Sequence, residues 1–296
     1  MIAARNRLLL SALTFTAAFS QAAPKLEAQS GATSIPALVD RSDTIVVARP
    51  LGSEVINGRK RWHFVVSRTL SGTSPRRFTL EEPEGRACGR ALSGLLPGLH
   101  HIAFLRSRGE GDPKLVISGA AALPKLSPAL EEFVQDLLAT EANSVERVQL
   151  LADAIRPASA SDPMQEHVDA SALSALSIHP RLAALDGERW SQLRSRARTV
   201  SEARPDVMPS VARLLLREGS IQSLSVLAEF AESPRPTEVR AYALRCLHQV
   251  PTEQLALVTA SLPLDRSLKL TRALQAVESV AEARRRFRSI RPGNIR

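Results

Sequence analysis

The stretch PTEVRAYALRCLHQVP, from Pro236 to Pro251, is bounded by two prolines and carries apolar side chains at helical spacing. The prolines limit the segment to three or four turns of helix, which would be short for a structure standing alone. Such a helix needs neighbours that cover its apolar side. A stack of similar antiparallel helices would provide them, and the flanking sequence has the same character. The apolar positions are Val239, Ala243, Leu244, Leu247 and Val250.

Two segments upstream repeat this helical period of about 3.6 residues. Short connections between such segments favour antiparallel neighbours. Leu130, Phe133, Val134, Leu137 and Leu138 share one side of the first, and Val145, Val148, Leu151, Ala152 and Ile155 share one side of the second. Further helices are expected over residues 168–176, 187–200, 207–217, 220–231, 237–249, 252–262 and 267–287.

The expected helix ends are marked by characteristic residues. Gly219 and Pro234 are typical of a helix end, because glycine adopts a left-handed backbone and proline cannot continue a helix. Thr237 and Thr252 are expected to cap the helices that follow them, since a threonine hydroxyl can accept a bond from the first free N–H groups.

Residues 35 to 123 show a period of two instead, which is typical of strands. The stretches TIVVARP, RWHFVVSRTL, RRFTLEE, HHIAFLR and KLVISGAAAL are each rich in β-branched or alternating apolar residues. Turn residues separate them, Asn57-Gly58 first among them. Trp62, Phe64, Phe78 and Phe104 fall where a core residue belongs. Ahead of the first strand, Ser34 and Pro36 favour a short helix.

The two periods predict an α+β chain of two domains. A small five-stranded β-barrel is expected over residues 34–123, because five short strands in so few residues favour a closed or half-closed sheet. Residues 124–128, with Pro124 and Pro128, form the predicted linker. An all-α domain of helical repeats, an α-solenoid, is expected over residues 129–290, and residues 291–296 form a basic tail.

The helical half resembles the HEAT and armadillo-type repeat families. The segment PTEVRAYALRCLHQV is similar to the second helix of a HEAT repeat, and PSVARLLLREGSIQSLSVLAEFAESP resembles helical hairpins of the same kind. The step from Val211 to Val239 is shorter than the roughly 40 residues expected of that repeat. The resemblance therefore implies a degenerate stack and names no ligand.

The strand half resembles a domain of bacterial exported proteins through VDRSDTIVVARP, FVVSRTLSG, LLPGLHHIAFL and VISGAAAL. This resemblance implies an oligonucleotide/oligosaccharide-binding-type barrel, similar to the netrin-like modules that include tissue inhibitors of metalloproteases. Ala48 and Ser71 stand where that pattern commonly has glycine and lysine. The expected mature chain begins at Ala23 and not at a metal-chelating cysteine, so the inhibitory mechanism is not implied.

The first 22 residues have the three parts of a cleavable secretory signal. Arg5 and Arg7 are its positive end, residues 8–19 its apolar segment, and cleavage is expected near Ala22. The apolar segment of 12 residues is too short for a spanning helix, which needs roughly 20. We therefore expect a periplasmic or secreted protein.

The chain is basic and has few cysteines. Its formal charge of +9 falls to +7 when Arg5 and Arg7 are removed with the signal. Cys88 and Cys246 are the two cysteines, and in an oxidising compartment they could pair if the two domains dock closely. Two separate buried thiols are the favoured interpretation.

The sequence contains no motif for a catalytic, metal or cofactor site. The histidines lack the i, i+4 spacing of a helical metal pair, and His100 and His101 would point to opposite faces of a strand. Arg86 and Arg90 could activate Cys88, but no base lies nearby in sequence. Adjacent acids such as Glu81-Glu82 diverge, so they do not form a carboxylate pair. No catalytic residue, metal or cofactor is therefore predicted.

Two basic clusters are the residues most suited to contact an anionic polymer or membrane surface. One lies at the expected hairpin tip and the other at the C-terminus. Specific nucleic-acid binding is not expected, because aromatics make up only 4% of the chain and single-strand binding needs stacking platforms. The clusters are Arg59, Lys60 and Arg61, and Arg284, Arg285, Arg286, Arg288 and Arg291.

These features predict an exported, noncatalytic protein of the bacterial envelope that binds another protein or scaffolds an assembly through its helical half. Two alternatives stay open. One is an envelope hydrolase whose residues converge from remote positions, and the other is a basic binder of an anionic envelope polymer. The partner, the oligomeric state and the functional face of the helices are not indicated by the sequence.

Overall fold

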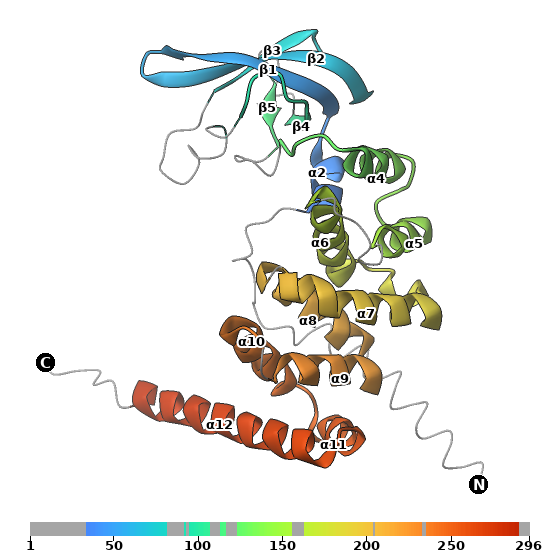
Figure 1. Ribbon diagram of the computed structural model, residues 1–296, viewed down its shortest axis with the longest axis vertical. Helices are drawn as coiled ribbons and strands as arrows, with labels where there is room; N and C mark the ends of the chain where they lie inside the picture. The colour runs from blue at the N-terminus through green and yellow to red at the C-terminus, as the bar shows by residue number, and fades with distance from the viewer. Residues whose placement is uncertain are drawn as a thin grey trace, which may run out of the picture. The chain divides into compact units, whose positions relative to one another are not determined.

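The chain folds as an α+β protein in which an antiparallel five-stranded sheet is followed by helices (Figure 1). The computed structural model describes residues 34–81, 92, 95–106, 113–116, 123–155, 163–203, 205–232 and 235–289, without the side chains of 163, 200–203 and 279–289. The expected signal at 1–22 lies outside these residues. The described chain divides into two compact units between Arg196 and Ala197.

The sheet has the strand order β3-β2-β1-β4-β5, with antiparallel neighbours throughout. Four of the five strands begin within the segments predicted from the alternating pattern, and β2 begins two residues before its predicted segment, at Arg59. In the described residues β3 and β5 form the two edges, so the sheet is open there and the predicted closure into a barrel is not seen. The strands are β1 (Thr44–Ile56), β2 (Arg59–Ser71), β3 (Arg77–Glu81), β4 (His101–Arg106) and β5 (Lys114–Leu115).

A long hairpin joins β1 to β2 through Asn57 and Gly58. Both residues have positive φ, of 53° and 77°, which is the conformation that a two-residue hairpin turn requires. The Asn-Gly turn predicted from the sequence is therefore confirmed. The ladder has a β-bulge at Leu51, because Pro50 pairs with Phe64 and Gly52 with the adjacent His63.

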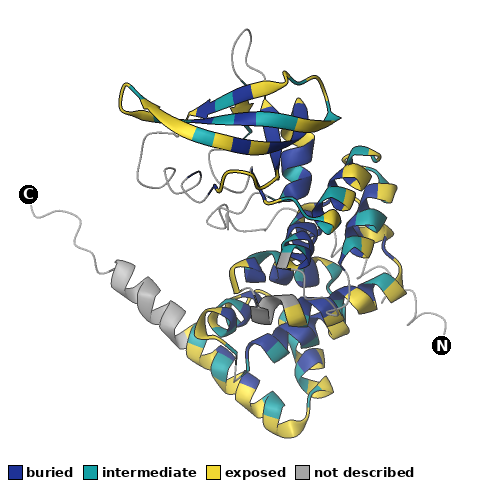
Figure 2. Ribbon diagram, turned by 45° about the horizontal axis from the view of Figure 1, so that its top comes forward, coloured by how far each residue is buried: buried dark blue, intermediate teal, exposed yellow. Residues whose placement is uncertain are grey.

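One face of the sheet forms a hydrophobic core. Trp62, Phe64 and Phe78 point into it, as their alternation predicted, and the rings of Phe64 and Phe78 stack with centroids 5.0 Å apart. Leu92, Leu95 and Leu123 come from outside the strands to cover this face. Along β2 and β3 the alternate residues are exposed or half-buried, as the banding of the strands in Figure 2 shows.

Helix α2 (Ile35–Arg41) connects the sheet to the first helices. It contacts β4, α4 and α6, and its Ile35 and Leu38 are fully buried. The predicted linker at residues 124–128 runs into α4, which begins at Pro128, and the sheet and these helices belong to the same compact unit. The helices are α4 (Pro128–Leu138), α5 (Val145–Ala154) and α6 (Pro163–Ile178), followed by η2 (Leu182–Ala184) and the start of α7 (Gly187–Ala203).

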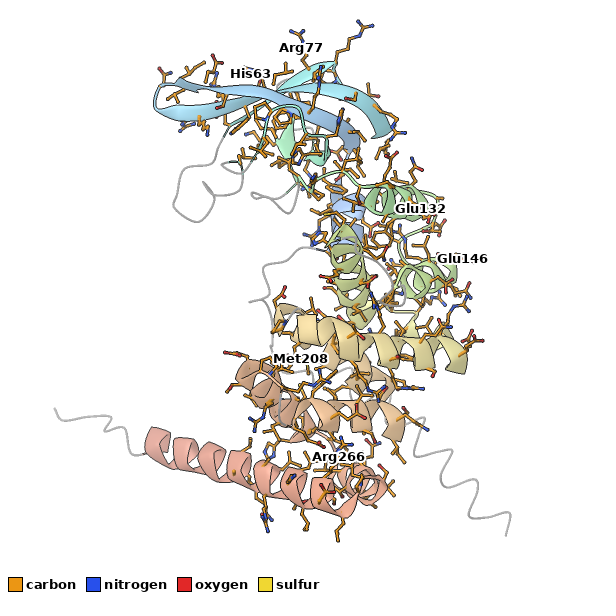
Figure 3. The ribbon with its side chains drawn as sticks, in the orientation of Figure 1. His63, Arg77, Glu132, Glu146, Met208 and Arg266 are labelled. Atoms are coloured by element: carbon orange, nitrogen blue, oxygen red, sulfur yellow. The ribbon has the colours of Figure 1, made fainter. Side chains whose placement is uncertain are left out.

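The residues after Ala197 continue as helices, with α12 the longest. Each helix from α8 to α11 contacts the next along the chain or the next but one, and α12 contacts both α10 and α11. An ion pair of Arg266 with Glu232, 2.8 Å long, ties α12 to the end of α9 (Figure 3). The elements are η3 (Pro205–Val207), α8 (Met208–Glu218), α9 (Ile221–Phe230), α10 (Thr237–Leu247), α11 (Thr252–Ser261) and α12 (Leu264–Ser289).

The helix ends agree with the predictions at Gly219 and disagree at the two threonines. Gly219 ends α8 with a left-handed φ of 68°. Thr237 and Thr252 do not cap their helices; the N-caps are Pro236 and Pro251, and neither makes a side-chain capping bond. Each proline has an extended ψ and occupies the N-cap position. Each threonine is therefore the first helical residue and not the cap.

Two buried arginines link helices of the first unit. Arg196 donates from Nε to Asp169 Oδ2 at 2.9 Å, and Gln165 donates to Asp169 Oδ1 at 2.8 Å, all three being buried. Arg147 of α5 donates to Thr140 O at 2.8 Å and to Asp40 Oδ1 at 3.3 Å. Its Nε and Nη1 atoms are buried without a partner. A shift of one helix against its neighbour would leave a buried charge without its partner, which is costly. These contacts therefore hold the helices in one relative position.

Candidate functional site

In the predicted basic cluster at the hairpin tip, two arginines share the carboxylate of Glu81. Arg61 Nη2 lies 2.5 Å from Glu81 Oε1, and Arg59 Nη1 lies 3.7 Å from Glu81 Oε2. Lys60 Nζ lies 4.8 Å from the ring centroid of Trp62, in a cation–π contact. The tip therefore offers an external anion less charge than three adjacent basic residues suggest.

The predicted C-terminal cluster lies mostly beyond the described side chains. Arg284, Arg285, Arg286 and Arg288 fall within the backbone of α12, which runs to Ser289, and Arg291 lies outside the described residues. A continuous helix spreads neighbouring arginines about 100° apart around its axis. These four residues therefore belong to a helix and not to an extended tail.

A polar array on the exposed face of the sheet centres on His63 of β2 (Figure 3). The Nε2 atom of His63 lies 2.8 Å from Glu54 Oε1 on β1. The Nδ1 atom lies 3.4 Å from Thr79 Oγ1 on β3. Three strands thus hold a carboxylate, an imidazole and a hydroxyl next to one another on the same face of the sheet.

The chemistry of this array suits binding better than acyl transfer. The hydroxyl and imidazole are 3.4 Å apart, longer than the roughly 2.6–3.2 Å that direct proton transfer requires. The backbone around His63 pairs on both sides, with β1 and with β3, so its N–H groups serve the ladder and not an oxyanion hole. About two-fifths of the His63 side chain is exposed, leaving the array open to a ligand (42%).

A depression of about 470 Å³ adjoins His63. Its lining includes Leu51, Gly52, Glu54, Arg77 and Thr79. The space is created by the backbone: Leu51 is the extra residue of the bulge, and Gly52, the neighbour of His63 in the ladder, has no side chain. A Cβ built on Gly52 would meet no atom within 4 Å.

Within the described part of the chain, His100 and His101 do not form a second site of this kind. His100 is exposed and lies 3.1 Å from Ser67 Oγ, whereas His101 is buried and its Nδ1 lies 3.0 Å from Leu123 O. Burial lowers the pKa of His101 below its ordinary value. Cys246 is a buried free thiol, and Cys88 lies outside the described residues.

The last helices expose an unusual amount of apolar side chain. Helix α11 buries Val258 alone, and the described part of α12 buries Leu270 and Leu274. The exposed fractions of Leu257, Leu264 and Leu268 are 55%, 77% and 50%. A stack of helices normally ends in a polar surface, so this apolar end is a second candidate for a binding surface.

Neither feature was identified from the sequence. His63, Glu54 and Thr79 lie on three strands, and only the register across the bulge brings them together. A signal for the leucines was present, since Leu264 and Leu268 are four apart and lie off the Leu270–Leu274 face of the same helix.

None of the helices among the described residues combines the length and apolar character needed to cross a membrane. The same residues contain no group of three or more histidine, cysteine or acidic side chains placed to hold a metal ion. Comparison with protein-family models, with curated proteins and with solved structures gives no match for this chain.

Proposed function

We propose that this chain is an exported, noncatalytic protein of the bacterial envelope that binds another protein through its final helices. The apolar surface of Leu257, Leu264 and Leu268 is the observation that carries the proposal. Each leucine removed from water contributes roughly 1.5–3 kcal/mol, so a partner that covered all three would gain several kcal/mol of association energy. A scaffold within an envelope assembly would use the same surface.

We also propose a fold type for each part of the chain and a location outside the cytoplasm. The helices after Ala197 serve as a degenerate stack of the HEAT or armadillo type, a view supported by the contacts of each helix with its neighbours. The sheet is an open relative of the oligonucleotide/oligosaccharide-binding module. Cleavage near Ala22 releases the mature chain into the periplasm or beyond, because residues 1–22 have the composition of a secretory signal.

The test is affinity capture from envelope extract with the full mature chain, residues 23–296, as bait. We expect one or a few proteins to be retained reproducibly, and to be lost when Leu264 and Leu268 are both replaced by glutamate. Val55→Glu is the matched control, because Val55 is 70% exposed and lies on the hairpin instead. It should leave capture unchanged.

The double variant must first be shown to fold, by a far-ultraviolet circular dichroism melt close to that of the parent. Because both leucines are at least half exposed, their replacement should change the midpoint little. Capture that survives Leu264→Glu with Leu268→Glu, or that is lost equally with Val55→Glu, would refute the proposed surface. Sedimentation analysis of the parent would separate self-association from binding of another protein.

A further inference from the structure

The exposed face of β1, β2 and β3 carries three cross-strand rows of side chains. Residues that pair directly across antiparallel strands point to the same side of the sheet. The row at the hairpin end holds acids, the middle row holds His63, and the third row holds two arginines. In order, the rows are Glu54, Arg61 and Glu81; Gly52, His63 and Thr79; and Arg49, Val65 and Arg77.

The acidic row and the arginine row differ in how their charges are satisfied. Glu81 contacts Arg59 and Arg61, and Glu54 contacts His63, so both acids already have a partner. Arg49 and Arg77 are exposed, and neither forms an ion pair with a carboxylate in the described part of the chain. Their two strands flank β2, which places the backbones about 10 Å apart.

The arrangement therefore has two unpaired guanidinium groups beside an open depression. Arg77 itself lines the depression, together with Thr79 and His63. A guanidinium group binds a carboxylate or phosphate through two parallel N–H bonds, and it does so more strongly than through neutral contacts. The bulge at Leu51 and the missing side chain at Gly52 leave room for the body of such a ligand.

We propose that this face binds a small ligand carrying an oxyanionic group, a carboxylate or a phosphate ester, on a hydroxylated body no larger than one sugar ring. Arg77 contacts the oxyanion, and Arg49 adds a second positive charge from the other side of Val65. The Thr79 hydroxyl and the outer oxygen of Glu54, both held in place by His63, bond to the hydroxyl groups over Gly52. The site is separate from the apolar surface of the last helices.

The test is titration calorimetry of the full mature chain at low ionic strength with three probes: glucuronate, glucose 6-phosphate and neutral glucose. The first two distinguish a carboxylate from a phosphate, and glucose should give no heat of binding. We expect Arg77→Gln to weaken binding by about tenfold or more, since a bidentate contact is lost. Arg49→Gln should weaken it by a smaller factor.

Gly52→Val tests the depression directly. The backbone of Gly52 has no positive φ, and its position within a strand suits a β-branched residue, so the fold should tolerate the change. The valine side chain would fill the space beside His63, and binding of the charged probes should be abolished. An unchanged melting midpoint confirms that only the site was altered.

Arg59→Gln is the matched charge control. It removes the same unit of charge from the same sheet, but Arg59 already contacts Glu81, so affinity should change by less than about twofold. An equal loss with Arg59→Gln, full binding by Gly52→Val, or no binding of either charged probe at millimolar concentration would overturn the site. None of these outcomes bears on the capture experiment, which concerns residues of α12.

Discussion

Arg147 shows at the residue scale how much a buried charge depends on few contacts. Its side chain is 3% exposed, and its Nη2 atom donates to Thr140 O and to Asp40 Oδ1. Burial lowers the pKa of this guanidinium, and Asp40 partly opposes that effect. The cost of burying two unsatisfied N–H groups is therefore built into the native state.

We expect Arg147→Ala to destabilise the protein by about 2–4 kcal/mol, because it opens a cavity and removes the link between α5 and Asp40. Arg147→Met should cost less than half of that, since it keeps the volume and removes the unsatisfied groups. Urea unfolding followed by circular dichroism measures both. Equal losses of stability in the two variants would show that the charge, and not the packing, holds this region.

Cys246 provides a pH-dependent prediction at the same scale. Burial raises the pKa of its thiol to about 11. Above pH about 8.5 the unfolded thiol loses its proton while the folded thiol keeps it, so the unfolded state is favoured and stability falls as pH rises. The effect is absent below that pH and reaches at most about 3 kcal/mol near pH 11.

The comparison is between the Cys88→Ser chain and the same chain with Cys246→Ala. Between pH about 8.5 and about 10.5 the first should lose stability more steeply than the second. Other groups that titrate there are common to both chains and cancel in the difference, except Tyr242, whose pKa is raised by burial and by the charge of Cys246. Parallel curves would show that the thiol ionises freely in the folded state.

The sequence could not indicate which charged residues are buried in the core. Arg147 is four positions before Leu151, and Asp169 four before Leu173, so both lie on the apolar faces of their helices. In the sequence, a charged residue on such a face only interrupts the spacing of apolar residues, and nothing indicates the oppositely charged residue that pairs with it. The partners, Asp40 and Arg196, come from other helices at distant sequence positions.

At the element scale, serine side chains cap three of the helices. Ser127, Ser144 and Ser220 each accept a bond from the backbone N–H three residues later, which satisfies one free donor of α4, α5 and α9. Thr252 follows a proline that already occupies the cap position, so its hydroxyl makes no capping bond.

Ser144→Ala should therefore cost about 1 kcal/mol, the usual value of a lost N-cap. Thr252→Ala should be nearly neutral or slightly stabilising, because alanine has the higher helix propensity. Chemical denaturation of both variants gives the difference. Equal losses would mean that Thr252 acts as a cap in solution.

Strands of the sheet could be predicted where the sequence of the connecting turn is clear. Asn57-Gly58 has a sequence that requires positive φ, and the alternation of Trp62 and Phe64 fixes which face is buried. The bulge at Leu51 has no such signal, because a single extra residue leaves the apolar alternation of β2 intact. The charged rows on the outer face depend on that bulge and stayed hidden with it.

At the scale of the whole molecule, the described chain forms two compact units that meet in sequence within α7. The change from period two to period 3.6 located the switch from strands to helices near Pro128. It could not locate the boundary of the compact units, because the burial of α2 against α4 and α6 depends on contacts far apart in sequence.

We expect thermal unfolding to depart from a single two-state transition, with a calorimetric enthalpy larger than the van't Hoff enthalpy. Asp169→Asn leaves Arg196 buried without a counter-ion, at a cost of about 3–5 kcal/mol to the unit that contains both. It should lower one component of the transition and leave the other in place. A uniform shift of one sharp transition would show that the two units unfold together.

The end of the hairpin allows only certain changes of length. In the described part of the chain, its last two pairs, Val55 with Lys60 and Ile56 with Arg59, have no third strand beside them. Removing one residue from each strand together would shorten the arm and keep the rows around His63 aligned. Losing a residue from one strand alone would shift the ladder by one. Natural variants of this arm should therefore differ in length by even numbers of residues. The reach of the tip should change in steps of one residue pair.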